Sequence, residues 1–138
     1  MTPERMAQIH AAAFVHDRGW SRNEFAALAA QPHTDVIFRP DGFALTRTLA
    51  GESELLTLAV SPDHQRHGIA HSLLAEWISA ASQHADVAFL EVAADNFGAL
   101  TLYQKSGFTR SGLRKAYYAR AGGPAADAVL MTKALTRG

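Results

Sequence analysis

The order of hydrophobic patterns between residues 54 and 92 constrains the fold more than any other feature of this chain. Residues 54–60 (ELLTLAV) form a nearly continuous apolar run that a Ser-Pro pair ends, which is typical of a buried strand. From Gly68 onward, apolar residues recur at spacings of three and four and predict an amphipathic helix. Residues 86–92 (DVAFLEV) then show the pattern of a short buried strand. This order predicts two parallel strands joined by a helical crossover.

The chain before this unit predicts two helices and a β-hairpin. Thr2-Pro3-Glu4 combines a hydroxyl cap, a proline and an acid, as a helix N-terminus does, and Ser21 and Glu24 have the spacing of a capping box. Residues 35–39 and 43–49 flank a Pro-Asp-Gly turn and predict a hairpin. With the strand that follows, they predict a meander of consecutive antiparallel strands.

The remainder predicts one more helix and two late strands. Asn96 opens the helix and Gly107 ends it, and residues 108–118 and 128–135 have the character of strands. We therefore expect a mixed, mostly antiparallel central sheet flanked by helices, classed as α/β, or as α+β by some conventions. The length of 138 residues and the hydrophobic fraction of 48% suit a single domain over residues 1–138.

The composition excludes several partners and chemistries. Lys plus Arg number 13 and Asp plus Glu number 13, so no broad basic field exists to attract nucleic acid or an anionic membrane. The absence of cysteine excludes disulfides, thiolate metal ligands and a cysteine acyl carrier. Residues 1–13 lack the apolar core of a signal peptide, and no run approaches the length of a membrane span. We expect a cytoplasmic protein.

The stretch between the first crossover strand and its helix suits a phosphate group. A tight loop with Gly68 and Ala70 would expose successive backbone N–H groups at a helix N-terminus, and Arg66 adds a cation beside them. A simpler interpretation is that Gly68 only permits the turn, and the spacing alone leaves both open. A P-loop is excluded because no Gly-Lys-Ser/Thr follows, and a dinucleotide fingerprint is excluded because its three-glycine pattern is absent.

Two motifs identify a family resemblance. Gln65-Arg66-His67-Gly68-Ile69-Ala70 resembles the Gln/Arg-x-x-Gly-x-Gly/Ala motif of the GNAT superfamily of N-acetyltransferases, whose loop amides hold the pyrophosphate of acetyl-CoA. Leu90-Glu91-Val92, Asn96 and the segment 102–108 (LYQKSGF) are similar to the second characteristic block of that superfamily. Residues 113–118 with 127–131 further resemble the RimI branch, whose members acetylate the N-terminal alanine of a ribosomal protein. The resemblance implies a GNAT-like fold and acetyl-CoA as cosubstrate.

The resemblance also implies two catalytic side chains. Glu91 stands at the position of the base that removes the proton of the amine, directly or through water, and its neighbours Leu90 and Val92 would place it in apolar surroundings that strengthen a base. Tyr103 stands at the position of the acid that protonates the departing thiolate. From the residues alone, the alternatives are a solvent-facing glutamate on an edge strand and a packing tyrosine with a hydrogen-bonded hydroxyl.

A cofactor cleft and an acceptor side follow from the same resemblance. The backbone of Leu58, Ala59 and Val60 would bind the pantetheine amides like an added strand, with one N–H available to the thioester oxygen. Asn96 and Tyr103 would contact the cofactor near its thioester, although Asn96 also suits a helix N-cap. Tyr117 and Tyr118 would line the acceptor side, where the alternative is an exposed aromatic pair on a strand. The pyrophosphate would be bound by Gln65, Arg66, His67, Gly68, Ile69 and Ala70.

A metal site is the less favoured interpretation of three clustered histidines. Only a regular helix through His64, His67 and His71 would align them, and the first two precede the predicted helix, so we expect no metal. We expect direct attack of a primary amine on acetyl-CoA, and the resemblance to the RimI branch implies a protein N-terminal α-amine as the acceptor. A small-molecule amine acetyltransferase on the same fold and a non-catalytic acyl-CoA-binding sensor module are the alternatives. Whether the chain is a monomer or a homodimer stays open.

Overall fold

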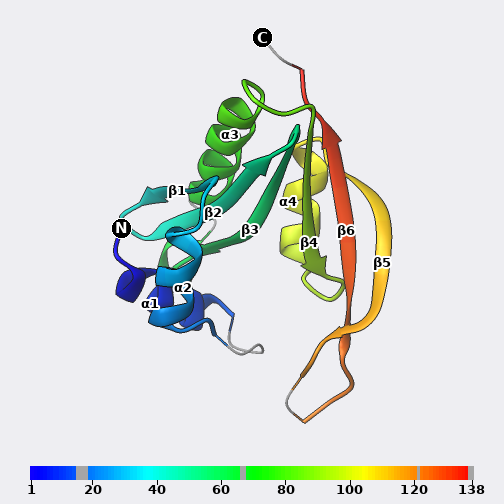
Figure 1. Ribbon diagram of the computed structural model, residues 1–138. Helices are drawn as coiled ribbons and strands as arrows, with labels where there is room; N and C mark the ends of the chain where they lie inside the picture. Colours follow the sequence, from blue (N-terminus) through cyan, green and yellow to red (C-terminus); the bar gives the residue numbers. More distant parts are fainter. Residues whose placement is uncertain (15–18, 66–67, 121, 137–138) are drawn as a thin grey trace.

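The structure is a computed structural model that describes residues 1–14, 19–65, 68–120 and 122–136 (Figure 1). Within these ranges, no helix combines the length and the hydropathy that a membrane span requires. The elements in chain order are α1 (Pro3–Ala13), α2 (Arg22–Ala29), β1 (Thr34–Arg39), β2 (Gly42–Leu49), β3 (Glu52–Val60), the 3₁₀ helix η1 (Pro62–His64), α3 (Ile69–Ala81), β4 (Val87–Ala93), α4 (Phe97–Lys105), β5 (Thr109–Tyr118) and β6 (Ala126–Ala134).

The strands form one six-stranded sheet in the order β1-β2-β3-β4-β6-β5. The pair β3–β4 is parallel and the other pairs are antiparallel, which confirms the predicted hairpin, meander and crossover and the mixed, mostly antiparallel class. The late strands do not simply follow one another across the sheet, because β6 lies between β4 and β5 and leaves β5 at the edge. This order decides which side chains of β5 reach β4.

Helices cover both faces of the sheet, with α1 and α2 on one face and α3 and α4 on the other. Helices α1 and α2 lie beside β1, β2 and β3 (Figure 1). They pack on these strands through a cluster that includes Met6, Phe25 and Phe43. On the opposite face, Trp77 of α3 stacks on Phe108 with ring centroids 5.8 Å apart, inside the cluster that also receives α4. The indole N–H of Trp77 donates a hydrogen bond to the buried Ser53 Oγ at 2.9 Å, so this buried donor has a partner.

The N-terminal caps that the sequence predicts for the first two helices are present in the structure. The hydroxyl of Thr2 accepts a hydrogen bond from the Arg5 N–H at 3.1 Å. Ser21 and Glu24 form both bonds of a capping box, each 3.1 Å long. Such caps satisfy backbone N–H groups that a helix leaves unpaired, which fixes where α1 and α2 begin.

Strands β3 and β4 separate at their carboxyl ends, and this separation positions the site. Their ladder joins Glu52–Leu55 to Val87–Leu90 and ends there. Beyond it, β3 continues to Val60 against β2, whereas β4 continues to Ala93 against β6, and Figure 1 shows the two strands diverging. The facing backbone edges of the two strands are therefore not paired with each other over these last residues.

Candidate active site

The turn that leads into α3 has the geometry of an anion-binding helix N-terminus. Gly68 is the N-cap with φ of 80° and ψ of 4°, in the left-handed region that glycine adopts without steric cost. The first turn of α3, beginning with Ile69 and Ala70, leaves its N–H groups without intrahelical acceptors, and Ser72 N–H is bonded to the Gly68 carbonyl at 2.9 Å. Residues 66–67 of the motif, Arg66 and His67, lie outside the described residues.

The turn is supported by contacts with the strand ends on either side of it. The side-chain amide of Gln65 donates to the Val60 carbonyl at 3.0 Å, so this residue braces the loop against the end of β3. At Gly42, an added Cβ would lie 3.0 Å from Ile69 Cγ2 and 3.2 Å from the Ala59 carbonyl oxygen. The absence of a side chain at Gly42 therefore lets the start of α3 approach the sheet closely.

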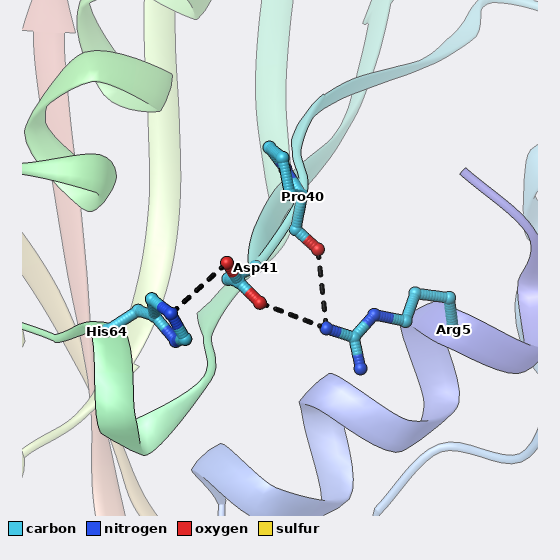
Figure 2. Close-up of polar contacts among 4 residues, drawn as sticks. All are labelled: Arg5, Pro40, Asp41 and His64. Carbon is cyan, nitrogen blue, oxygen red and sulfur yellow. Dashed lines mark hydrogen bonds and ion pairs between the residues drawn. The ribbon is translucent and has the colours of Figure 1, made fainter.

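Figure 2 shows a polar network that joins this turn to the first helix. The carboxylate of Asp41 lies 3.1 Å from Arg5 Nη2 of α1 and 3.3 Å from His64 Nε2 of η1. Arg5 also donates to the Pro40 carbonyl at 3.3 Å, and Ser61 N–H donates to the backbone carbonyl of Asp41 at 2.8 Å. Asp41 thus connects α1, the β1–β2 turn and the segment that precedes the phosphate-binding turn. Sequence reasoning did not find it, because its partners are distant along the chain.

Glu91 lies on β4 with its side chain 23% exposed, and its carboxylate is 3.1 Å from Arg114 Nη2 of β5. The expectation that Leu90 and Val92 surround this carboxylate is wrong. Both of these side chains are buried in the core on the opposite face, since successive residues of a strand point to opposite sides. The group beside Glu91 is instead the Arg114 guanidinium, which occupies one of the carboxylate oxygens.

Tyr103 lies in α4 with only 7% of its surface exposed, and its ring meets that of Phe108 edge to face at a centroid distance of 6.2 Å. Burial raises the pKa of the Tyr103 phenol well above its ordinary value, and the nearby Tyr118 raises it further. The hydroxyl therefore remains protonated throughout the physiological pH range. That is the form from which a proton can be donated.

Two tyrosines of β5 connect the surroundings of Glu91 and Tyr103. The rings of Tyr117 and Tyr118 meet at 5.2 Å and 84°. The Arg114 guanidinium lies 5.3 Å from the centroid of the Tyr117 ring, so contacts run from Glu91 through Arg114 to the tyrosine pair. The structure thus brings together four residues that the sequence singled out, together with Arg114, whose role the sequence did not indicate.

The chain departs from a regular strand where these tyrosines emerge. Ala116 has a positive φ of 52°, and its N–H donates to Asp127 Oδ1 at 2.8 Å. The register between β5 and β6 shifts between Arg114 and Tyr118. This irregularity re-aims the end of β5, as bulges beside functional sites commonly do.

Asn96 and the end of β3 lie at the same end of the sheet as Glu91, because each follows or forms the carboxyl end of a parallel strand. The Asn96 side chain accepts a hydrogen bond from Ala99 N–H at 3.2 Å, which confirms its N-cap role. Leu58, Ala59 and Val60 pair with β2 on one edge, and their other edge faces the opening toward β4. Contact of these residues with a cofactor stays a prediction.

The histidine cluster does not assemble into a ligand set in the part of the chain that the structure describes. There, no group of three or more His, Cys, Asp or Glu side chains could hold a metal ion. His64 faces Asp41 at 3.3 Å, as described above, whereas His71 belongs to the first turn of α3. His67 lies outside the described residues.

Comparison with known proteins defines the class. An acetyltransferase (GNAT) domain model matches residues 9–119, so the chain belongs to the GNAT family of acetyltransferases, which use acetyl-CoA. Within the family, it is similar to an N-alpha-acetyltransferase RimI of Mycobacterium tuberculosis, with 36% identity over 94% of this chain and 85% of the relative. It is also 30% identical to a ribosomal protein bS18-alanine N-acetyltransferase of Escherichia coli, over 94% of this chain and 90% of the relative.

A solved structure of an enzyme of the same kind has the same fold as this chain. The crystal structure of the ribosomal-protein-S18-alanine N-acetyltransferase from Escherichia coli superposes with a TM-score of 0.87 and 27% identity, covering 99% of this chain and 89% of that one. The predicted family and its RimI-type branch are therefore confirmed, and the chain is an N-acetyltransferase. The roles of its individual site residues stay predictions.

Proposed function

We propose that this chain transfers the acetyl group of acetyl-CoA to the α-amine at the N-terminus of a protein, as a single domain in the cytoplasm. The observation that carries the proposal is the position of Glu91 just beyond the last pair of the β3–β4 ladder, together with the buried, protonated Tyr103 of α4, whose pKa is raised by burial and by Tyr118 of β5. Two relatives that align over 94% of the chain are an N-alpha-acetyltransferase and a ribosomal protein bS18-alanine N-acetyltransferase, which supports this acceptor class.

In the proposed complex, the first-turn N–H groups of α3 after Gly68 hold the pyrophosphate, and the backbone edge of residues 58–60 that faces away from β2 binds the pantetheine amides. Acetyl-CoA supplies an activated thioester. A backbone N–H of β3 polarises the carbonyl oxygen of that thioester, and the two walls of the opening hold the reactants together. The chain's contribution at this stage is positioning and electrostatic stabilisation.

The proton transfers are assigned to two side chains. As the neutral amine nitrogen forms its bond to the carbonyl carbon, Glu91 accepts the proton that the nitrogen loses, directly or through water. As the carbon–sulfur bond breaks, Tyr103 donates its proton to the sulfur, so that the products are the amide and CoA thiol. The Tyr103 phenolate is then reprotonated from solvent. Glu91 releases the proton that it accepted to solvent, which restores both side chains for the next turnover.

The test is release of free CoA thiol from acetyl-CoA, measured with peptides that begin with alanine and with a panel of polyamines and aminoglycosides. Turnover on the peptides supports the proposal. Turnover confined to the small amines would replace the acceptor class by the alternative. Stabilisation against thermal unfolding by acetyl-CoA without thiol release from any acceptor would favour the sensor module.

Gly68→Glu is expected to weaken acetyl-CoA binding by about 30-fold or more. The substitution forces a left-handed conformation on a residue with a side chain and places a negative charge where the pyrophosphate is proposed to bind. Isothermal titration calorimetry measures the dissociation constant. Gly122→Glu is the matched control, since Gly122 also has a positive φ, 74°, and open space around its Cβ position. Equal binding by both variants would refute the phosphate site.

Asp41→Asn is expected to raise the dissociation constant of acetyl-CoA about two- to threefold and to leave turnover at saturating acetyl-CoA unchanged. The effect is small because the contacts of Asp41 with Arg5 and His64 are partly exposed, and such polar contacts contribute about 1 kcal/mol or less. The matched control is Glu4→Gln. Glu4 belongs to α1, as Arg5 does, but its ion pair is with Arg22 and not with the segment before α3. A change in the acceptor KM instead would contradict this role.

A further inference from the structure

The carboxylate assigned as the base is paired with a cation that belongs to the chain itself. Arg114 and Glu91 are brought onto one face because Arg114 is opposite Ala128 in the β5–β6 ladder, and Ala128 is opposite Ala93 in the β4–β6 ladder. The guanidinium then lies 3.1 Å from the carboxylate and 5.3 Å from the Tyr117 ring centroid. Arg114 therefore contacts both the proposed base and a residue of the proposed acceptor side.

The pairing of Arg114 with Glu91 affects which protonation state of the acceptor amine is attracted to the site. A protein α-amine has a pKa of about 7.7–8.0, so most of the acceptor is an ammonium ion at pH 7. The lone pair that attacks a thioester exists only in the neutral amine. A carboxylate without a counter-ion attracts the ammonium form, which is the majority species and cannot react. A guanidinium already seated on that carboxylate cancels much of the attraction.

We infer that Arg114 is a specificity-determining residue that keeps ammonium ions off Glu91 and so favours entry of the neutral amine. The inference rests on the proposed function, because it assigns Glu91 to an amine acceptor. Arg114 acts here through Glu91 and is not itself a proton donor or acceptor in the reaction.

The position of Arg114 on the same face of the sheet as Glu91 distinguishes it from the other cations of β5. Cations on an edge strand also discourage pairing with other chains, and β5 carries Arg110 and Lys115 as well. Arg110 is opposite Met131, whose side chain is buried in the core on the face away from Glu91. Arg110 is therefore a matched control with the same charge on the same exposed strand.

The experiment measures binding of one peptide in two charge states. The wild type, Arg114→Gln, Arg114→Lys and Arg110→Gln are each saturated with CoA, which carries no acetyl group and prevents turnover. The dissociation constant is then measured at pH 7 for an alanine-initiated peptide with a free N-terminus and for its N-acetylated form. The first peptide is mostly cationic at its N-terminus and the second is neutral there.

Removal of the Arg114 charge is expected to strengthen binding of the peptide with the cationic N-terminus only. Unit charges about 4 Å apart in water interact by an amount that corresponds to about a fivefold change in an equilibrium constant. Arg114→Gln should bind the free peptide about fivefold more tightly and the acetylated peptide unchanged. Arg114→Lys, which keeps the charge, and Arg110→Gln should resemble the wild type.

Three results would overturn the inference. Equal binding of the free peptide by the wild type and Arg114→Gln shows that the guanidinium does not repel the ammonium. Weaker binding of both peptides by Arg114→Gln assigns Arg114 to direct peptide contact or to local structure. If the wild type acetylates no peptide in the thiol-release assay, the proposed function fails and the inference fails with it, whereas peptide turnover with unchanged affinities refutes the inference alone.

Discussion

Glu91→Gln lowers the turnover number for peptide acetylation by about 10²–10⁴-fold, the range that loss of a general base commonly produces. Glutamine preserves the size of the side chain and can still accept a hydrogen bond from Arg114, but its amide oxygen does not take up a proton near neutral pH. The affinity for acetyl-CoA stays close to that of the wild type, because the proposed cofactor contacts come from β3 and from the start of α3.

The measurement is single-turnover formation of the acetylated peptide, with acetyl-CoA affinity determined separately by calorimetry. Glu54→Gln is the matched control, since Glu54 is also partly buried and is paired with an arginine, Arg47, at 2.8 Å. That variant should retain wild-type turnover. A Glu91→Gln enzyme with turnover within a few-fold of the wild type would show that the proton of the amine leaves by another route.

Features that depend on neighbouring residues were predictable from the sequence. The caps at Thr2 and Ser21, the apolar strands before and after the crossover helix, and the glycine at the start of that helix all follow from residues within a few positions of each other. Each rests on a local physical rule, such as hydrogen bonding of a side chain to a free N–H or the steric tolerance of glycine for positive φ.

The surroundings of the site required the three-dimensional order of the strands. The contact of Arg114 with Glu91 exists because β6 returns between β4 and β5, and no local pattern fixes where the last strand inserts. The network of Asp41 with Arg5 and His64 likewise joins three separate segments. The error about the neighbours of Glu91 has a different origin, since the alternation of side chains along a strand already separates residue 91 from residues 90 and 92.

Tyr103→Phe lowers the turnover number by about 10²-fold, at the lower end of the range for acid–base catalysis, because a thiolate leaves without protonation more readily than an alkoxide or an amide ion. The affinity for acetyl-CoA changes less than twofold. Phenylalanine keeps the ring against Phe108, so the midpoint of thermal unfolding should stay near that of the wild type. The loss is therefore expected in the chemical step, where the hydroxyl proton is transferred.

The pH dependence and a second tyrosine sharpen this test. Since burial and Tyr118 raise the pKa of Tyr103, the phenol is protonated at pH 7 and still protonated at pH 9, and the ratio of wild-type to variant turnover should be the same at both. Tyr117→Phe removes the hydroxyl of an exposed tyrosine on the proposed acceptor side, so its effect should fall on the peptide KM, with turnover at saturating peptide within about twofold of the wild type. A ratio that falls toward one at pH 9 would show that Tyr103 ionises in this range and is not the protonated acid that the structure indicates. Equal losses in Tyr103→Phe and Tyr117→Phe would instead point to shared packing of the aromatic side chains rather than to proton transfer from Tyr103.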